Sequence, residues 1–271
     1  MVEFILWTDK LKIVSRIKAE LRFKGLLFAM AYKKRIAYLF AFVFLSLFLY
    51  VLSLWLVSSY RILSDDPMVW EARIQKLVDN EVEGSLDAGI LLFVGSSSIR
   101  FFYNLDTFFV GRVVVKKGFG GAKIGDVEYY KDDLILKHRP AVLCLYLGTN
   151  DILYRDATVP VIAEEYVDLV EGLLDGMPHV SVALIALRPI RDVSNNNKFS
   201  QLNERMKTYS LSRNNVAYLD VNEVLLEDDG LADSALLQFD GLHLNKRGYD
   251  AWGNEMKDKV LLLSRNGSVG G

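Results

Sequence analysis

Three consecutive serines, residues 96–98, follow an apolar run that ends in a glycine, in the sequence LDAGILLFVGSSSIR (residues 86–100). An apolar run of this length followed by Gly95 and small polar residues is typical of a buried strand that ends where a helix begins. In open parallel sheets the ligand crevice lies beyond the carboxyl ends of the strands, where backbone N–H groups favour negative charge. A serine at such a junction can be a nucleophile. Alternatively, the three serines only cap the helix.

A serine nucleophile needs a base within hydrogen-bond reach, and histidine, with an ordinary pKa of about 6.5, suits that role. Of the three histidines, His138 and His179 each precede an expected strand and belong at the edge of the sheet opposite Ser97. His243 follows the last expected strand, in FDGLHLNKRGY. Asp240 lies close enough in sequence to hold the imidazole in the tautomer that leaves its other nitrogen as the base. A capped turn is the alternative for this D-x-x-H spacing.

Acyl transfer also requires hydrogen-bond donors for the oxyanion of the tetrahedral intermediate. Two further strand ends supply candidates. The glycines Gly118, Gly120 and Gly121, in GFGGAKIGD, let the backbone approach a ligand and expose an N–H group, or form an ordinary glycine turn. In GTND, Asn150 can present its side-chain amide to the same oxygen, or cap the helix that follows.

The elements that must position these residues alternate along the chain. Apolar runs predict strands at residues 90–94, 112–115, 141–147, 180–187 and 216–219, and helical patterns occupy residues 124–136, 161–174, 200–211 and 246–263. Such alternation requires crossover connections and hence a mainly parallel sheet with helices on both faces. We expect an α/β fold, a flavodoxin-like three-layer sandwich with five strands, over residues 62–265. Residues 188–198 are expected to form a rim loop and residues 266–271 a frayed tail.

The amino-terminal part of the chain has a different composition. Residues 1–35 carry nine Lys or Arg against three acids, and residues 36–57 carry no charge. A helix over residues 36–57 spans about 33 Å, enough to cross a bilayer core, and the positive-inside rule places the basic segment in the cytoplasm. We therefore expect a single-pass anchor with the larger domain extracytoplasmic, or periplasmic in a Gram-negative cell. A cleaved signal peptide and a buried soluble helix are the alternatives, and translation can start at Met1 or Met30.

Composition excludes several classes of protein. A hydrophobic content of 51% excludes a disordered chain. The net charge of -2, with the basic excess confined to residues 1–35, leaves the remainder acidic and argues against a nucleic-acid partner. The single cysteine, Cys144, excludes an intramolecular disulfide and lies in an apolar run expected in the core. The sequence shows no metal-ligand cluster or phosphate loop, so we expect neither a metal nor a cofactor.

Four blocks, GSSSI, GFGG, GTND and DGLH, occur in this order at predicted strand ends, and with them residues 70–263 resemble the SGNH hydrolases, also called GDSL-type esterases. The resemblance implies that Ser97 is the nucleophile, His243 the base and Asp240 its orienting acid. It also implies that the Ser97 amide, Gly121 and Asn150 form the oxyanion hole. Ser96 stands where the family usually has Asp, and a hydroxyl there can still cap the helix.

The function implied by this resemblance is hydrolysis of carboxylic esters through an acyl-enzyme. Together with the anchor expected at residues 36–57, this predicts an outward-facing serine esterase tethered to a membrane. One alternative is an O-acyltransferase that passes the acyl group to a polysaccharide hydroxyl. Another is an inactive ligand-binding domain. The expected partners are a small-molecule, glycan or lipid ester and, through residues 36–57, the membrane; the sequence predicts neither the specificity nor the oligomeric state.

Overall fold

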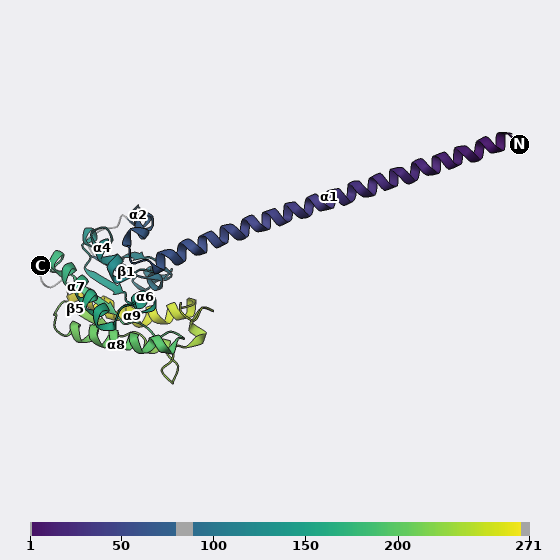
Figure 1. The fold of residues 1–271 in the computed structure, drawn as a ribbon. Coiled ribbons are helices and arrows are strands. Elements are labelled where there is room, and N and C mark those ends of the chain that lie inside the picture. Colours follow the sequence, from purple (N-terminus) through teal and green to yellow (C-terminus); the bar gives the residue numbers. More distant parts are fainter. Residues whose placement is uncertain (1, 80–88, 267–271) are drawn as a thin grey trace. The chain divides into compact units, whose positions relative to one another are not determined.

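Figure 1 shows the computed structural model, which describes residues 2–79 and 89–266. The chain divides into two compact units, Met1–Ser59 and Tyr60–Gly271. The helix α1 (Val2–Leu63) makes up the first unit, and its last turn belongs to the second. Within the described residues, one helical stretch is long and apolar enough to cross a membrane, Tyr32–Leu63, whose most apolar 18-residue window has a mean hydropathy of 2.5. It includes the span predicted at residues 36–57.

The second unit is built on a sheet of five strands in the order β2-β1-β3-β4-β5, and all four pairings are parallel. The strands are β1 (Ile90–Gly95), β2 (Val113–Gly118), β3 (Val142–Tyr146), β4 (Ser181–Ile185) and β5 (Val216–Leu219). Gly95, the last residue of β1, pairs with Gly118 of β2 and Tyr146 of β3. These three strands therefore end level, and the segments that follow them meet at one edge of the sheet.

The helices of the second unit lie on both faces of the sheet, which confirms the predicted α/β sandwich. On one face, Trp252 packs its ring 5.3 Å from that of Tyr146 in β3. The helices are α2 (Glu71–Asp79), α3 (Ser97–Arg100), α4 (Ile124–Tyr129), α5 (Lys131–Leu134), α6 (Thr149–Tyr154), α7 (Val159–Gly176), α8 (Val193–Ser210) and α9 (Lys246–Asn266). A 3-10 turn, η1 (Pro67–Trp70), precedes α2.

The core is formed by the central strands. Every residue of β1 and β3 is buried, which explains why both read as continuous apolar runs rather than alternating ones. Cys144 of β3 is among them, as predicted, and burial raises the pKa of its thiol. The central strands thus provide a rigid base for the loops that follow them.

Two predictions about local structure are wrong. The helix predicted at residues 124–136 is divided into α4, α5 and a 3-10 turn, Leu136–His138. The rim loop predicted at residues 188–198 ends early, because α8 begins at Val193 after Asp192, whose carboxylate accepts from the N–H of Ser194 at 3.0 Å. This cap starts the helix despite three consecutive asparagines, which favour helices weakly.

Candidate active site

Ser97 is the first residue of α3, directly beyond the carboxyl end of β1. Its Oγ lies 2.8 Å from Nε2 of His243, and Nδ1 of His243 lies 2.6 Å from Oδ2 of Asp240. The structure thus joins these three predicted residues in one hydrogen-bonded chain, although Ser97 and His243 are 146 positions apart. When Nδ1–H donates to the ionised carboxylate, Nε2 is left as the acceptor for the serine hydroxyl proton.

Asp240 is held by its own loop as well as by the imidazole. Its Oδ1 accepts from the backbone N–H groups of Leu242 and His243, each at 2.9 Å. Partial burial acts to raise the pKa of Asp240, but the hydrogen bonds from the His243 side chain and from these backbone groups hold it below its ordinary value. The ring of Phe101 meets the imidazole edge-on, with 5.1 Å between centroids. The imidazole therefore has a defined hydrogen-bond partner at each nitrogen, Asp240 at Nδ1 and Ser97 at Nε2.

The segment after β2, residues 118–124, forms what we call the glycine loop. Within it Gly121 has φ +88°, in the left-handed region that side chains disfavour. A Cβ at this position would lie 2.9 Å from Cγ1 of Ile62 and 3.0 Å from Cζ2 of Trp70. Both the backbone conformation and the lack of space thus require glycine here.

Asn150 comes from the segment after β3 and reaches the glycine loop. Its Nδ2 donates to the carbonyl of Ala122 at 2.9 Å, and the next residue, Asp151, accepts from the N–H of Ile124 at 3.2 Å. A side-chain amide carries two N–H groups, so one remains for a ligand. The alternative in which Asn150 caps the helix is wrong, because Gly148 occupies the cap position of α6.

The serines that flank Ser97 do not cap α3 as predicted. Ser96 occupies the cap position, but its side chain makes no capping hydrogen bond. The N–H of Ile99, one of the groups that a capping side chain can bind, donates instead to the Ser96 carbonyl at 3.1 Å. Ser98 lies inside α3, and its carbonyl accepts from the Tyr249 hydroxyl at 3.0 Å.

Sequence reasoning missed Arg188, which it assigned to the rim loop predicted at residues 188–198. Arg188 is only 2% exposed, and its Nη2 donates to the carbonyl of Leu242, next to His243. Its Nε and Nη1 are buried with no hydrogen-bond partner in the described part of the chain. A single arginine after a strand carries no sequence signal for such a position. Arg188 supports the loop that carries Asp240 and His243.

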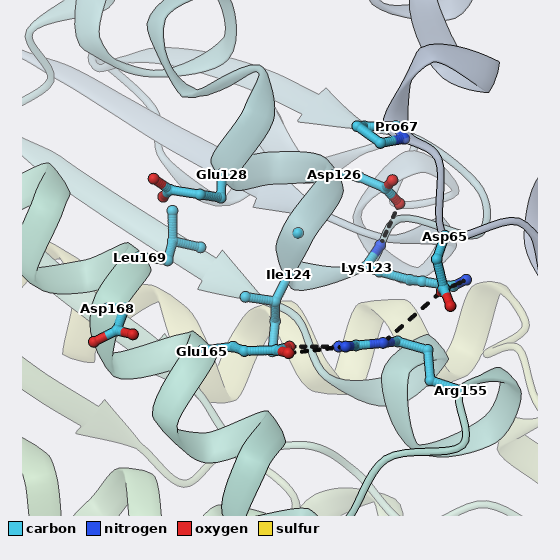
Figure 2. Close-up of a pocket in the computed structure, with 11 residues that line it drawn as sticks. Asp65, Pro67, Lys123, Ile124, Asp126, Glu128, Arg155, Glu165, Asp168 and Leu169 are labelled. Carbon is cyan, nitrogen blue, oxygen red and sulfur yellow. Dashed lines mark hydrogen bonds and ion pairs between the residues drawn. The ribbon is translucent and has the colours of Figure 1, made fainter.

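A second missed feature is a charged cavity of about 310 Å³ beside the glycine loop, drawn in Figure 2. Lys123 is 3% exposed, and its Nζ donates to the carbonyl of Ser64 and to Oδ1 of Asp65, each at 2.8 Å. Arg155, which also lines the cavity, pairs with Glu165 at its edge and with the buried Asp151. These bonds tie the segment after α1 to the glycine loop, and none of the predicted site residues lines this cavity.

Two carboxylates under the glycine loop have raised pKa values. Oδ2 of Asp126 accepts from the backbone N–H of Lys123 at 2.9 Å. Burial raises the pKa of Asp126 to about 6 and that of Asp151 to about 6. Across residues 2–79 and 89–266 there is no group of three His, Cys, Asp or Glu side chains that could hold a metal ion.

Comparison with known proteins identifies the fold and the family. The model of the GDSL-like Lipase/Acylhydrolase family matches residues 100–251, beginning just after Ser97. No curated protein matches the chain. Similar solved structures include a Streptococcus pneumonia protein, with 20% identity, a TM-score of 0.64, and coverage of 78% of this chain and 99% of that chain. A GDSL-like lipase from Bacteroides thetaiotaomicron has 16% identity and a TM-score of 0.59, with coverage of 70% of this chain and 97% of that chain. An acetylxylan esterase from Geobacillus stearothermophilus has 17% identity and a TM-score of 0.52, with coverage of 64% of this chain and 94% of that chain.

Proposed function

Because the chain belongs to the GDSL-like Lipase/Acylhydrolase family, we propose that it is a serine esterase that hydrolyses carboxylic esters through an acyl-enzyme. The observation that carries the proposal is the hydrogen-bonded chain from Asp240 through His243 to Ser97 at the end of β1. This arrangement is the one by which a histidine activates a serine hydroxyl.

In the first half of the proposed reaction, Ser97 Oγ attacks the ester carbonyl carbon while His243 Nε2 takes the hydroxyl proton. The carbonyl oxygen becomes an oxyanion. The tetrahedral intermediate then collapses, the bond to the alcohol breaks, and His243 returns the proton to the departing oxygen. Water enters in the same way in the second half, and the carboxylic acid leaves.

The proposed oxyanion donors are the N–H groups of Ser97 and Gly121 and the side-chain amide of Asn150. Within the described residues, the two backbone N–H groups donate to no other acceptor. The second N–H of Asn150 is likewise uncommitted, since its hydrogen bond to Ala122 uses only one. Each correctly placed donor contributes about two to three decades in rate.

The test uses the full chain in nonionic detergent with short-chain nitrophenyl esters. We expect turnover that Ser97→Ala lowers by at least about 10³-fold, and labelling of Ser97 by a fluorophosphonate probe. Ser98→Ala is the matched control, because Ser98 is the adjacent serine and, among the described residues, Nε2 of His243 bonds to Ser97 and not to Ser98. Full activity in Ser97→Ala would refute the assignment. Product analysis with a sugar acceptor separates hydrolysis from acyl transfer.

We also propose that residues 36–57 anchor the protein in a membrane, with residues 1–35 in the cytoplasm and the esterase domain, residues 62–265, outside it. The uncharged residues 36–57, within the candidate span Tyr32–Leu63, and the basic residues Lys33, Lys34 and Arg35 directly before them support this topology. External protease added to intact cells should degrade the domain and leave a membrane-bound amino-terminal fragment. Release of the whole domain into the medium would instead indicate a cleaved signal peptide.

A further inference from the structure

We propose that Arg73 and Arg100 form an anion-binding subsite beside the glycine loop. The preferred substrate would then be an ester that carries a carboxylate or phosphate near the scissile bond. This inference rests on the proposed esterase function and specifies its substrate class.

Arg100 lies within the candidate active site. It is the last residue of α3, the short helix that begins with Ser97. Its Nη1 is 3.2 Å from the position that a Cβ of Gly120 would occupy, and its Cζ lies 5.2 Å from the centre of the Phe101 ring. The same ring contacts His243. The guanidinium therefore adjoins both the glycine loop and the ring that packs against the proposed base.

Arg73 lies in α2, which begins directly after Trp70, a residue that packs against the same loop. Trp70 packs its ring 5.3 Å from that of Phe119 and against Gly121. Arg73 follows Trp70 by one helical turn, and residues at this spacing share a face. Its Nε is buried with no hydrogen-bond partner in the described residues. Burial and the positive charge of Arg100 lower the pKa of Arg73, but a guanidinium stays protonated in proteins.

Among the described residues, neither guanidinium has an acidic partner. Within residues 2–79 and 89–266, ion pairs engage Arg155 and Arg213, whereas neither Arg73 nor Arg100 pairs with a carboxylate. The positive charge of Arg100 acts on Arg73, and two like charges that interact are unfavourable without a counter-ion. A guanidinium presents donors in a planar fork that matches a carboxylate or a phosphate. The group that completes this arrangement is therefore an anion, and its place beside the glycine loop puts it within reach of a bound ester.

The experiment compares matched esters on the full chain in nonionic detergent. Para-acetoxybenzoate carries a carboxylate on the alcohol part of the scissile ester, and in its methyl ester this carboxylate is neutralised. Mono-para-nitrophenyl adipate carries a carboxylate on the acyl part of the scissile ester, and in its methyl ester this carboxylate is likewise neutralised. We expect kcat/KM of the native protein to favour the anionic ester of at least one pair by about 10-fold or more, the effect of one charge-assisted contact. The favoured pair identifies the side of the ester that carries the anion.

Arg73→Gln and Arg100→Gln should each lower kcat/KM for the anionic ester far more than for its neutral partner, so that the ratio approaches one. Arg73→Lys and Arg100→Lys, which keep the charge, should retain part of the preference. Arg205→Gln, an exposed arginine of α8, is the matched control and should keep the native ratio. Raised ionic strength should also reduce the preference.

Equal ratios in the native protein and in both Gln variants would overturn the subsite. Should the native protein hydrolyse none of the four esters, the esterase proposal fails, and binding then decides the subsite separately. For that purpose, para-acetoxybenzoate is titrated into Ser97→Ala protein with and without Arg100→Gln. Weakening of binding by about 10-fold in the double variant supports the subsite, and unchanged binding refutes it.

Discussion

Replacing Gly121 with alanine tests whether the glycine loop and the segment after α1 are packed as one unit. At φ +88°, a residue with a side chain loses about 1–2 kcal/mol. The added Cβ would also lie 2.9 Å from Ile62 Cγ1 and 3.0 Å from Trp70 Cζ2, and overpacking of this kind costs about 1–3 kcal/mol. We expect Gly121→Ala to lower the free energy of unfolding by about 2–5 kcal/mol.

Substitutions at two other glycines distinguish the two causes of the expected loss of stability, backbone strain and overpacking by the added Cβ. Gly111 has φ +80° but nothing within 4 Å of an added Cβ, so Gly111→Ala should show only the backbone cost of about 1–2 kcal/mol. Gly120 has no positive φ, and its added Cβ would meet only the flexible end of Arg100, so Gly120→Ala should destabilise the protein least. The difference between the Gly121 and Gly111 variants measures the contact with Ile62 and Trp70.

The assays are thermal unfolding followed by near-ultraviolet circular dichroism and hydrolysis of a short nitrophenyl ester. Because the Gly121 N–H is a proposed oxyanion donor, its displacement should lower kcat by up to about 10²–10³-fold. Adding Trp70→Phe, which removes the nearest indole atoms, should restore part of both losses. The reasoning is refuted if Gly121→Ala is no less stable than Gly111→Ala and hydrolyses the ester at the native rate.

Three further predictions concern the same site. Asn150→Ala should lower kcat by about 10²-fold or more with little change in KM, measured on the nitrophenyl ester, because a proposed transition-state donor is lost. Arg188→Met should lower kcat by about 10-fold, because the hydrogen bond from Arg188 to the Leu242 carbonyl positions the loop that carries His243. The melting temperature should not fall, because a buried guanidinium without a carboxylate partner contributes little to stability. Asp126→Asn should raise the unfolding free energy by about 2 kcal/mol near pH 7 and change it little near pH 4. Between those limits the folded state, with a pKa of about 6 for Asp126, binds more protons than the unfolded state, so the native protein loses stability as pH rises. Unfolding curves across this pH range check the sign.

The sheet and the meeting of the candidate residues could be predicted because both follow from local patterns. Fully buried strands read as apolar runs, and their alternation with helices sets a parallel sheet. The level ends of β1, β2 and β3 then bring Ser97, Gly121 and Asn150 to one edge. The division of the helix predicted at residues 124–136 was not predictable, because a tertiary contact lies at the break. Tyr130, between α4 and α5, is buried and donates its hydroxyl to Glu71 of α2 at 3.1 Å.

The contacts around the glycine loop depend on packing between distant segments, and no periodicity in the chain encodes them. Ile62 lies just beyond the span predicted at residues 36–57, and no sequence pattern links it or Trp70 to Gly121, yet both fill the space that Gly121 leaves open. Lys123 reads as a surface lysine, but its ammonium is buried against Ser64 and Asp65. The segment that leaves the apolar helix is thus bound to the loop that carries a proposed oxyanion donor. A change in residues 62–70 should therefore affect the chemistry at Ser97 through the position of this loop, although none of these residues is among the proposed catalytic residues.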